Sequence, residues 1–280
     1  MILHFHKYHA LWNDFVVLDQ TANPRISRDR LPAVARAVCD PRTGIGADGI
    51  LWLTASRKGD CRMHVYNADG SWAEKSGNGL RITAVHLKES HPSRRHFDIE
   101  TVTSVDRSDI LRKVTGGYLV RTELGQPQFE VAGLPMKSRS KYVINRSVKI
   151  GKNNIWMTCL KVGNPHAVIF VDSFDFEWKE LGAQIETARN FPRGTNVEFV
   201  RVLDRTHLKL AEWERGAGAT GSSGTGAAGA VCAAVVLGLA DRRCRVEFEA
   251  GELEVDWRAD NMVELTGPVQ FIMRGEFEYL

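Results

Sequence analysis

The spacing of apolar residues predicts strands along most of the chain and three helices between them. Strand-like alternation, in which every second residue is apolar, is clear in CRMHVY, YLVRT and RVEFE at residues 61–66, 118–122 and 245–249. Helical spacing predicts helices at residues 31–39, 80–88 and 227–239. The last helix consists almost entirely of Ala, Gly, Val and Leu, so it has no polar face and must be enclosed on all sides.

The order of three landmarks predicts two copies of one unit. A turn with Asn before an apolar strand, a Gly turn before a second strand, and a Ser-Gly-X-Gly turn before a helix each occur twice. Their offsets are 151, 148 and 147 residues, counted between Asn13 and Asn164, Gly46 and Gly194, and Ser76 and Ser223. Three unrelated turns of an ordinary α/β protein are the alternative explanation.

The domain boundary is predicted near the sequence VTGGY at residues 114–118, where the strand pattern breaks. We expect a first domain at residues 1–117, completed by a C-terminal strand at residues 269–280. The second domain is expected at residues 118–268. Each half then consists of many strands around one apolar helix, and that helix begins just after a Ser-Gly turn.

Composition indicates a globular protein and argues against nucleic acid as a partner. The chain has 280 residues, 43% hydrophobic and 25% charged, with a formal net charge of +3. Its basic residues are scattered except at residues 94–96 and 137–152, and neither group contains a nucleic-acid-binding motif, so both are expected to be solvated surface. No apolar stretch reaches the roughly 18 residues that a membrane span needs.

The cysteines predict neither a metal site nor a disulfide framework. Their number is odd, no CxxC pair occurs, and none has ligand-like spacing to histidine: Cys39, Cys61, Cys159, Cys232 and Cys244. The first residues, MILHFHKYHALWNDF, lack the basic and apolar segments of a signal peptide. A cytoplasmic location is therefore expected.

The two Ser-Gly turns are candidate substrate sites. A helix N-terminus leaves N–H groups without intrahelical partners and carries partial positive charge, and flanking glycines let a carboxylate approach the backbone. Two groups on opposite faces of one carbon, one removing a proton and one returning it, would invert a stereocentre without a cofactor. The alternative is that Ser76 and Ser223 are plain helix N-caps.

Six motifs in this sequence resemble those of the diaminopimelate epimerase family, within the cofactor-independent amino-acid racemases and epimerases. They are HALWNDF (9–15), TGIGADG (43–49), YNADGSWAE (66–74), GNPH (163–166), RGTNV (193–197) and ERGAG (214–218). The resemblance implies an α/β fold of two pseudo-symmetric domains, each a β-sheet or barrel wrapped around a central helix, with the active site in the interdomain cleft. It also implies conversion of LL- to meso-diaminopimelate for lysine and peptidoglycan synthesis, with no cofactor or metal, and it suggests a homodimer.

The catalytic pair departs from the family. Members of the family place a cysteine before each Gly-X-Gly, whereas this chain has Ser76 and Ser223. A serine hydroxyl is a poor general base near neutral pH and needs a neighbour that activates it. The resemblance suggests His9 and His166 as candidates, while Lys75 is expected to face solvent.

The residues that would hold the substrate match the family. Glu214 is implied as a further catalytic residue near the reacting α-amino group, together with Asn13. The distal end of the substrate is assigned to Asn67, Asn164, Asn196 and Arg215. Backbone N–H groups are implied to bind the other carboxylate at Gly77, Asn78, Gly224 and Thr225.

The sequence thus predicts a cofactor-independent amino-acid epimerase with a serine pair. Three alternatives stay open: an amino-acid-binding protein with impaired catalysis, an isomerase or lyase with altered chemistry, and serines engineered to trap a substrate. Solvent deuterium uptake at the α-carbon separates an epimerase from a binding protein.

Overall fold

The computed structural model describes residues 1–279, and the chain forms two compact units. One contains Met1–Glu123 and Thr266–Leu280, and the other contains Leu124–Leu265. The chain leaves the first unit within strand β8 (Gly117–Gly125) and returns within β17 (Val263–Glu278). The VTGGY turn, where sequence spacing placed the boundary, joins β7 to β8 in one hairpin, so it lies inside the first unit.

The two units repeat one order of elements. The first contains, before β8, β1 (Ile2–Ala10), β2 (Asn13–Asp19), α1 (Leu31–Cys39), β3 (Gly49–Thr54), β4 (Cys61–Asn67), β5 (Trp72–Ala73), α2 (Gly77–Ser90), β6 (His96–Glu100) and β7 (Val105–Val114). The second begins with η1 (Val131–Gly133) and β9 (Arg146–Ile150). It continues, before β17, with β10 (Asn153–Val162), β11 (Asn164–Phe170), α3 (Trp178–Glu186), β12 (Asn196–Asp204), β13 (His207–Glu214), β14 (Gly218–Thr220), α4 (Gly224–Val236), β15 (Arg243–Phe248) and β16 (Gly251–Trp257).

Strand pairing repeats as well. The parallel pairs are β2 with β3 and β4 with β6 in the first unit, and β11 with β12 and β13 with β15 in the second. Even the register matches, since Leu51 faces Val65 and, 147 positions later, Glu198 faces Glu212. The repeated landmarks in the sequence therefore mark equivalent positions of two similar units.

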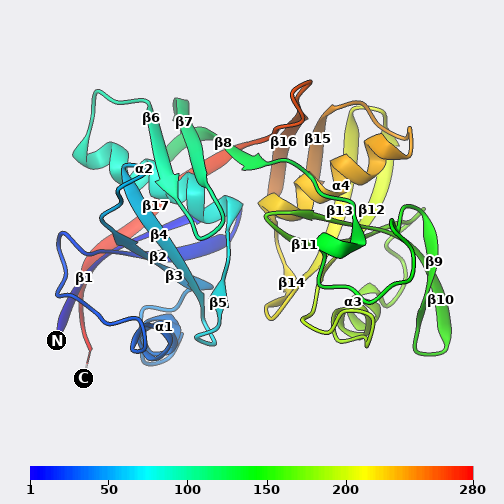
Figure 1. Cartoon of the computed structure of the whole chain (residues 1–280). Helices are drawn as coiled ribbons and strands as arrows, with labels where there is room; N and C mark the ends of the chain where they lie inside the picture. The colour runs from blue at the N-terminus through cyan, green and yellow to red at the C-terminus, as the bar shows by residue number, and fades with distance from the viewer. Residues whose placement is uncertain (280) are drawn as a thin grey trace. The chain divides into compact units, whose positions relative to one another are not determined.

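A central helix lies inside the strands of each unit, α2 in the first and α4 in the second (Figure 1). Residues 77–86 of α2 and 224–234 of α4 are all buried. Because α4 is surrounded, it can tolerate only small or apolar side chains, as the composition of its sequence predicted. Both helices begin three residues earlier than predicted, because the Ser-Gly-X-Gly turn supplies the cap and the first turn.

A second helix covers the outer face of each sheet. Helix α1 begins and ends at the predicted residues and packs Leu31, Val34 and Val38 against a cluster that includes Ile50 and Trp52. Helix α3 packs on the second sheet in the same way, with Ile185 in its apolar cluster. The spacing of apolar residues did not predict α3. Within residues 1–279, no helix is both long and apolar enough to cross a membrane.

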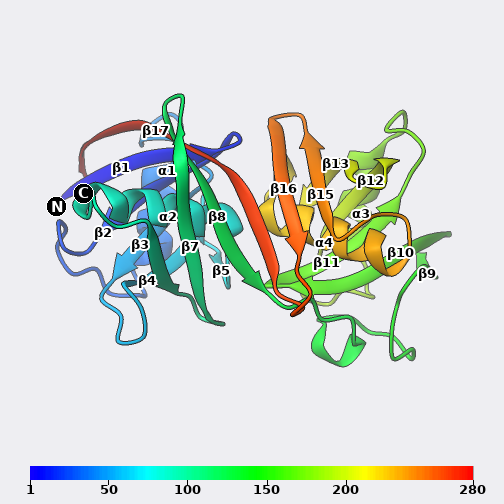
Figure 2. The same cartoon turned by 90° about the horizontal axis from the view of Figure 1, so that it is seen from above.

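The end of the chain completes the first unit. Residues 270–278 of strand β17 pair with β1, and β17 also pairs with β8. At its end, Tyr279 N–H donates to the Met1 carbonyl at 2.8 Å, so the first and last described residues lie side by side (Figure 2). The first sheet is therefore closed by residues from opposite ends of the sequence.

Where β8 meets β17, the two backbones approach so closely that only Gly fits at position 117. A side-chain carbon there would collide with the carbonyl oxygen of Val269, and backbone cannot move aside as a side chain can. We expect Gly117→Ala to lower the free energy of unfolding by about 1–3 kcal/mol, measured by urea denaturation. Gly275→Ala in β17 is the control, since its new methyl group meets only the ring of Phe5. Equal losses in the two variants would contradict this explanation.

Candidate functional site

Ser76 and Ser223 form the same N-cap in the two units. Their backbone angles are nearly equal, with φ −135° and ψ 120° for Ser76, and φ −136° and ψ 129° for Ser223. Each hydroxyl oxygen accepts a hydrogen bond three residues on, from Gly79 N–H at 3.0 Å and from Gly226 N–H at 3.1 Å. This cap engages one lone pair and leaves the hydroxyl proton able to be donated. Capping and proton transfer are therefore compatible.

In the first unit, a chain of amides organises the first turn of α2. Asn78 donates to the Asn13 side-chain oxygen at 2.8 Å, and Asn13 donates to Asp48 at 2.9 Å. Arg81, fully buried, donates to Asn78 at 2.7 Å, and burial lowers the pKa of its guanidinium to about 9. Asn67 lies at the end of β4 and donates to the Ser71 hydroxyl at 2.9 Å. A hydrogen bond thus links Asn13 to Asn78, whereas Asn67 bonds to Ser71 and is not part of this chain of amides.

Lys75 does not face solvent, contrary to the expectation from its position before the helix. Its side chain is 2% exposed, and its ammonium donates to the Asp106 carboxylate at 2.6 Å and to the Ser104 hydroxyl at 3.3 Å. Burial lowers the pKa of Lys75, while Asp106 opposes that shift. The prediction failed because the partner strand β7 comes about 30 residues later, where local sequence gives no warning of it.

In the second unit, hydrogen bonds fix the ERGAG turn after β13. The side-chain oxygen of Asn196 accepts from Arg215 N–H at 2.9 Å, while its amide donates to the Pro165 carbonyl at 3.0 Å. Glu186 of α3 accepts from Gly216 N–H at 2.8 Å. Glu214 accepts from the Thr220 hydroxyl at 3.1 Å. The turn that presents Glu214 and Arg215 is therefore rigidly supported, and Asn196 acts on its backbone.

A group of buried ionisable side chains lies on the strands around α4. His166 on β11 and Glu198 on β12 are in contact, with 2.5 Å between Nδ1 and Oε1. Burial lowers the pKa of His166 to about 3 and raises the pKa of Glu198 well above its usual range. Burial therefore disfavours the charged form of each of these two side chains. His166 is enclosed within the unit, and its Nε2 has no partner among the described residues.

Glu212, on β13, is the third member of this group. Its side chain faces Glu198 across the β12–β13 pair, and the residue is 1% exposed. Burial and the charges of Glu214 and Glu198 raise the pKa of Glu212 well above its usual range, while the Ser223 side chain opposes that shift. Within residues 1–279, neither carboxylate oxygen of Glu212 has a hydrogen-bond partner of normal geometry.

Two glycines of α4 make room for these side chains. A methyl group at Gly226 would collide with the Glu212 carboxylate, and one at Gly229 would press on the ring of His166. Small residues here thus have a second purpose besides packing. The side chains of Glu212 and His166 can therefore approach the backbone of α4 closely, near its N-terminal cap.

Several of these residues were not predicted from the sequence. Neither Glu198 nor Glu212 was predicted as a site residue, although each shares a strand face with a buried apolar residue two positions away, Val200 for Glu198 and Leu210 for Glu212. A glutamate on the apolar face of a predicted strand was the feature of the sequence that could have identified them. The side-chain oxygen of Asn164 is buried without a partner in the part of the chain that the structure describes. The described residues contain no group of three or more His, Cys, Asp or Glu that could hold a metal ion.

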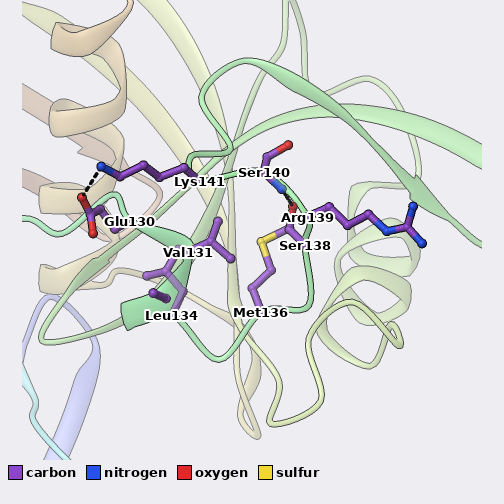
Figure 3. A pocket seen from close by; sticks show the side chains of 9 residues that line it. Glu130, Val131, Leu134, Met136, Ser138, Arg139, Ser140 and Lys141 are labelled. Atoms are coloured by element: carbon purple, nitrogen blue, oxygen red, sulfur yellow. Dashed lines mark hydrogen bonds and ion pairs between the residues drawn. The ribbon is translucent and has the colours of Figure 1, made fainter.

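A separate pocket lies on the second unit, around η1 (Figure 3). It encloses about 490 Å³ and contains none of the predicted site residues. Its rim carries an ion pair between Glu130 and Lys141 at 3.2 Å. The lining includes apolar Val131, Leu134 and Met136 with polar Ser138 and Arg139.

Comparison with known proteins decides the family. The sequence profile of diaminopimelate epimerase matches residues 5–127 and 158–272. The diaminopimelate epimerase of Carboxydothermus hydrogenoformans is 37% identical over 98% of this chain and 99% of its own. The chain belongs to the diaminopimelate epimerase family. It is therefore an isomerase of the cofactor-independent epimerase class, as its sequence motifs predicted.

Other relatives agree. The diaminopimelate epimerase of Caldanaerobacter subterraneus is 38% identical over 99% of this chain and 100% of its own. Among solved structures, a hydroxyproline epimerase from Agrobacterium vitis has a TM-score of 0.70 at 12% identity, covering 98% of this chain and 92% of its own. A phenazine biosynthesis protein from Bacillus anthracis has a TM-score of 0.70 at 14% identity, covering all of both chains. These structures confirm the predicted fold class.

The raised pKa of Glu212 predicts how stability depends on pH. A carboxyl whose pKa is higher in the folded state stabilises the fold below its unfolded pKa, near 4.5, and this contribution disappears as pH rises through the folded pKa. We expect Glu212→Gln to make the pH dependence of unfolding shallower above pH 5, by up to about 1.4 kcal/mol per pH unit.

Urea denaturation of wild type and variant between pH 5 and 9 measures this difference. The control is Glu247→Gln in the same unit, because Lys209 lowers the pKa of Glu247 and the carboxylate is ionised throughout this range. Parallel stability curves for wild type and Glu212→Gln would show that Glu212 does not take up a proton on folding.

Proposed function

We propose that the protein epimerises diaminopimelate at its α-carbon, with Ser76 and Ser223 as the two proton-transfer groups. The substrate is suggested by the relatives, which are diaminopimelate epimerases along their whole length. The observation that carries the proposal is the equivalence of the two serine caps. Two similar units each present one hydroxyl at the start of an enclosed helix, with nearly equal backbone angles.

The chemistry requires one serine to act as a base and the other as an acid. The alkoxide of one serine removes the α-proton, and the hydroxyl of the other donates a proton to the opposite face. An alkoxide at a helix N-terminus is stabilised by the positive end of the helix dipole. First-turn N–H groups lack intrahelical acceptors, so they suit the reacting carboxylate and the charge that develops on it. We assign this binding to the N–H groups of Gly77, Asn78, Gly224 and Thr225.

The supported ERGAG turn suits the remaining groups of a diamino acid. The guanidinium of Arg215 can bind the distal carboxylate, and Asn196 keeps its backbone in place. We assign Asn67 and Asn164 to the same end of the substrate, and Glu214 with Asn13 to the ammonium near the reacting carbon. His166 is buried beside Glu198. We therefore assign it an indirect catalytic role, in the protonation of the groups next to the site.

We further propose a homodimer in the cytoplasm. The five cysteines are buried and free, which suits a reducing compartment. The dimer follows from the family resemblance alone, and sedimentation of the purified protein measures it directly.

Proton NMR in deuterium oxide tests the proposed reaction. Loss of the α-proton signal from LL- or meso-diaminopimelate is expected with the native serines. The Ser76→Cys, Ser223→Cys double variant should exchange faster, by about 10-fold or more, because a helix N-terminus lowers the pKa of a thiol and supplies a thiolate. The control is Ser56→Ala, which removes a serine bonded to Glu100 outside the proposed site.

Comparison of the native protein with the double cysteine variant distinguishes the possible outcomes. Exchange by the double cysteine variant alone would show an epimerase pocket in which serines do not transfer protons. Absence of exchange from both proteins would exclude diaminopimelate as the substrate.

A further inference from the structure

The Glu212 carboxylate is buried beside the cap of α4 without any evident structural purpose. Burying a carboxylate is unfavourable unless hydrogen bonds or an opposite charge compensate it. Within residues 1–279, both of its oxygens lack a hydrogen-bond partner of normal geometry. The charges acting on Glu212 come from Glu214 and Glu198, and both are of the same sign. Retaining Glu212 therefore opposes folding.

Comparison between the two units shows that the fold does not need these polar residues. The equivalent strands of the first unit carry apolar side chains: Phe15 for His166, Leu51 for Glu198 and Val65 for Glu212. All three are buried. The same sheet and central helix thus form with an apolar layer in one unit and an ionisable layer in the other. The difference points to chemistry at Ser223 that Ser76 does not share.

Gly226 places Glu212 next to the hydroxyl of Ser223. Its N–H donates to Ser223 Oγ at 3.1 Å, while its Cα faces the Glu212 carboxylate so closely that no side chain fits between them. The Ser223 side chain also favours the ionised form of Glu212. Both groups therefore lie against one residue in the first turn of α4.

We propose that Glu212 accepts the hydroxyl proton of Ser223 and so generates the base of the second unit. This inference rests on the proposed function. The O–H bond of Ser223 breaks, its proton bonds to a Glu212 carboxylate oxygen, and the electron pair stays on Oγ. Oγ then takes the α-proton of the substrate, whose C–H electron pair passes to the α-carbon and its carboxylate. In the reverse direction the same steps return both protons.

The surroundings of Glu212 suit a proton acceptor at neutral pH. The charged groups near it are Glu198 on β12, with His166 behind it, and Glu214 at the end of β13, which Arg215 follows in the sequence, while α4 contributes no charged side chain. A carboxylate held among other carboxylates is a stronger base than one in water. Its basicity thereby moves toward the operating pH, where general bases are most efficient.

Glu212→Gln, made with the native Ser223 and again together with Ser223→Cys, tests the inference. The readout is the α-proton exchange rate of diaminopimelate in deuterium oxide. With Ser223, we expect Glu212→Gln to slow exchange by about 10²-fold or more, since a general base contributes roughly 10²–10⁴. In the Ser223→Cys background the same change should alter the rate less than about 3-fold, because the thiolate forms without that base.

A pH profile distinguishes proton transfer from a structural role. The wild-type rate should rise as Glu212 ionises, and this rise should be absent from the Glu212→Gln protein that carries Ser223→Cys. Glu212→Val gives the second unit the side chain of the first and should fold, by circular dichroism, yet lose exchange with Ser223. Glu100→Gln, which removes a glutamate bonded to Ser56 outside the proposed site, should keep the rate within about 2-fold of wild type.

The outcomes separate this inference from the proposed function. Equal losses with the native Ser223 and with Ser223→Cys, or an unchanged rate in Glu212→Gln, would overturn the role of Glu212 alone. No exchange by wild type, with exchange by the double cysteine variant, would overturn both the serine mechanism and its activation by Glu212. Absence of α-proton exchange in every variant would exclude diaminopimelate as the substrate. It would also overturn the role of Glu212, which rests on that substrate.

Discussion

Enclosure of a helix by strands is the constraint on which the rest of the structure depends. A helix that is surrounded on all sides cannot place its N-terminal N–H groups in bulk water, so a side chain must cap them. Ser76 and Ser223 meet this need with matching geometry. The positions where the fold requires a cap are thus the positions to which we assign proton transfer. Under this proposal, stability and function act on the same two hydroxyl groups.

The sequence alone predicts structure correctly where one segment determines its own environment. The Ser-Gly-X-Gly turns located both helix starts to within three residues, and the apolar composition of residues 227–239 predicted an enclosed helix. Motifs around Asn164 and Arg215 identified the family. These features depend on neighbours within a few residues, or on a pattern shared with relatives.

The sequence alone does not predict contacts whose partners come from distant strands. Lys75 is buried because Asp106 on β7 meets it, and nothing near residue 75 predicts that contact. Glu212 lies beneath α4 through the pairing of β13 with β12, which sequence spacing does not reveal. Helix α3 was missed because its exposed residues obscure a short apolar face. Long-range contacts therefore decide both the environment of the site and the protonation of its groups.

The closing of the first sheet by β17 has a consequence for synthesis of the chain. The second unit is continuous in sequence, Leu124–Leu265, so it is synthesised before the part of β17 that pairs with β1. The first unit lacks this partner of β1 until the whole second unit has been made. Domains generally fold as units while the chain is made, in the order in which they become complete. Here the half that begins the sequence is therefore the half that finishes folding last.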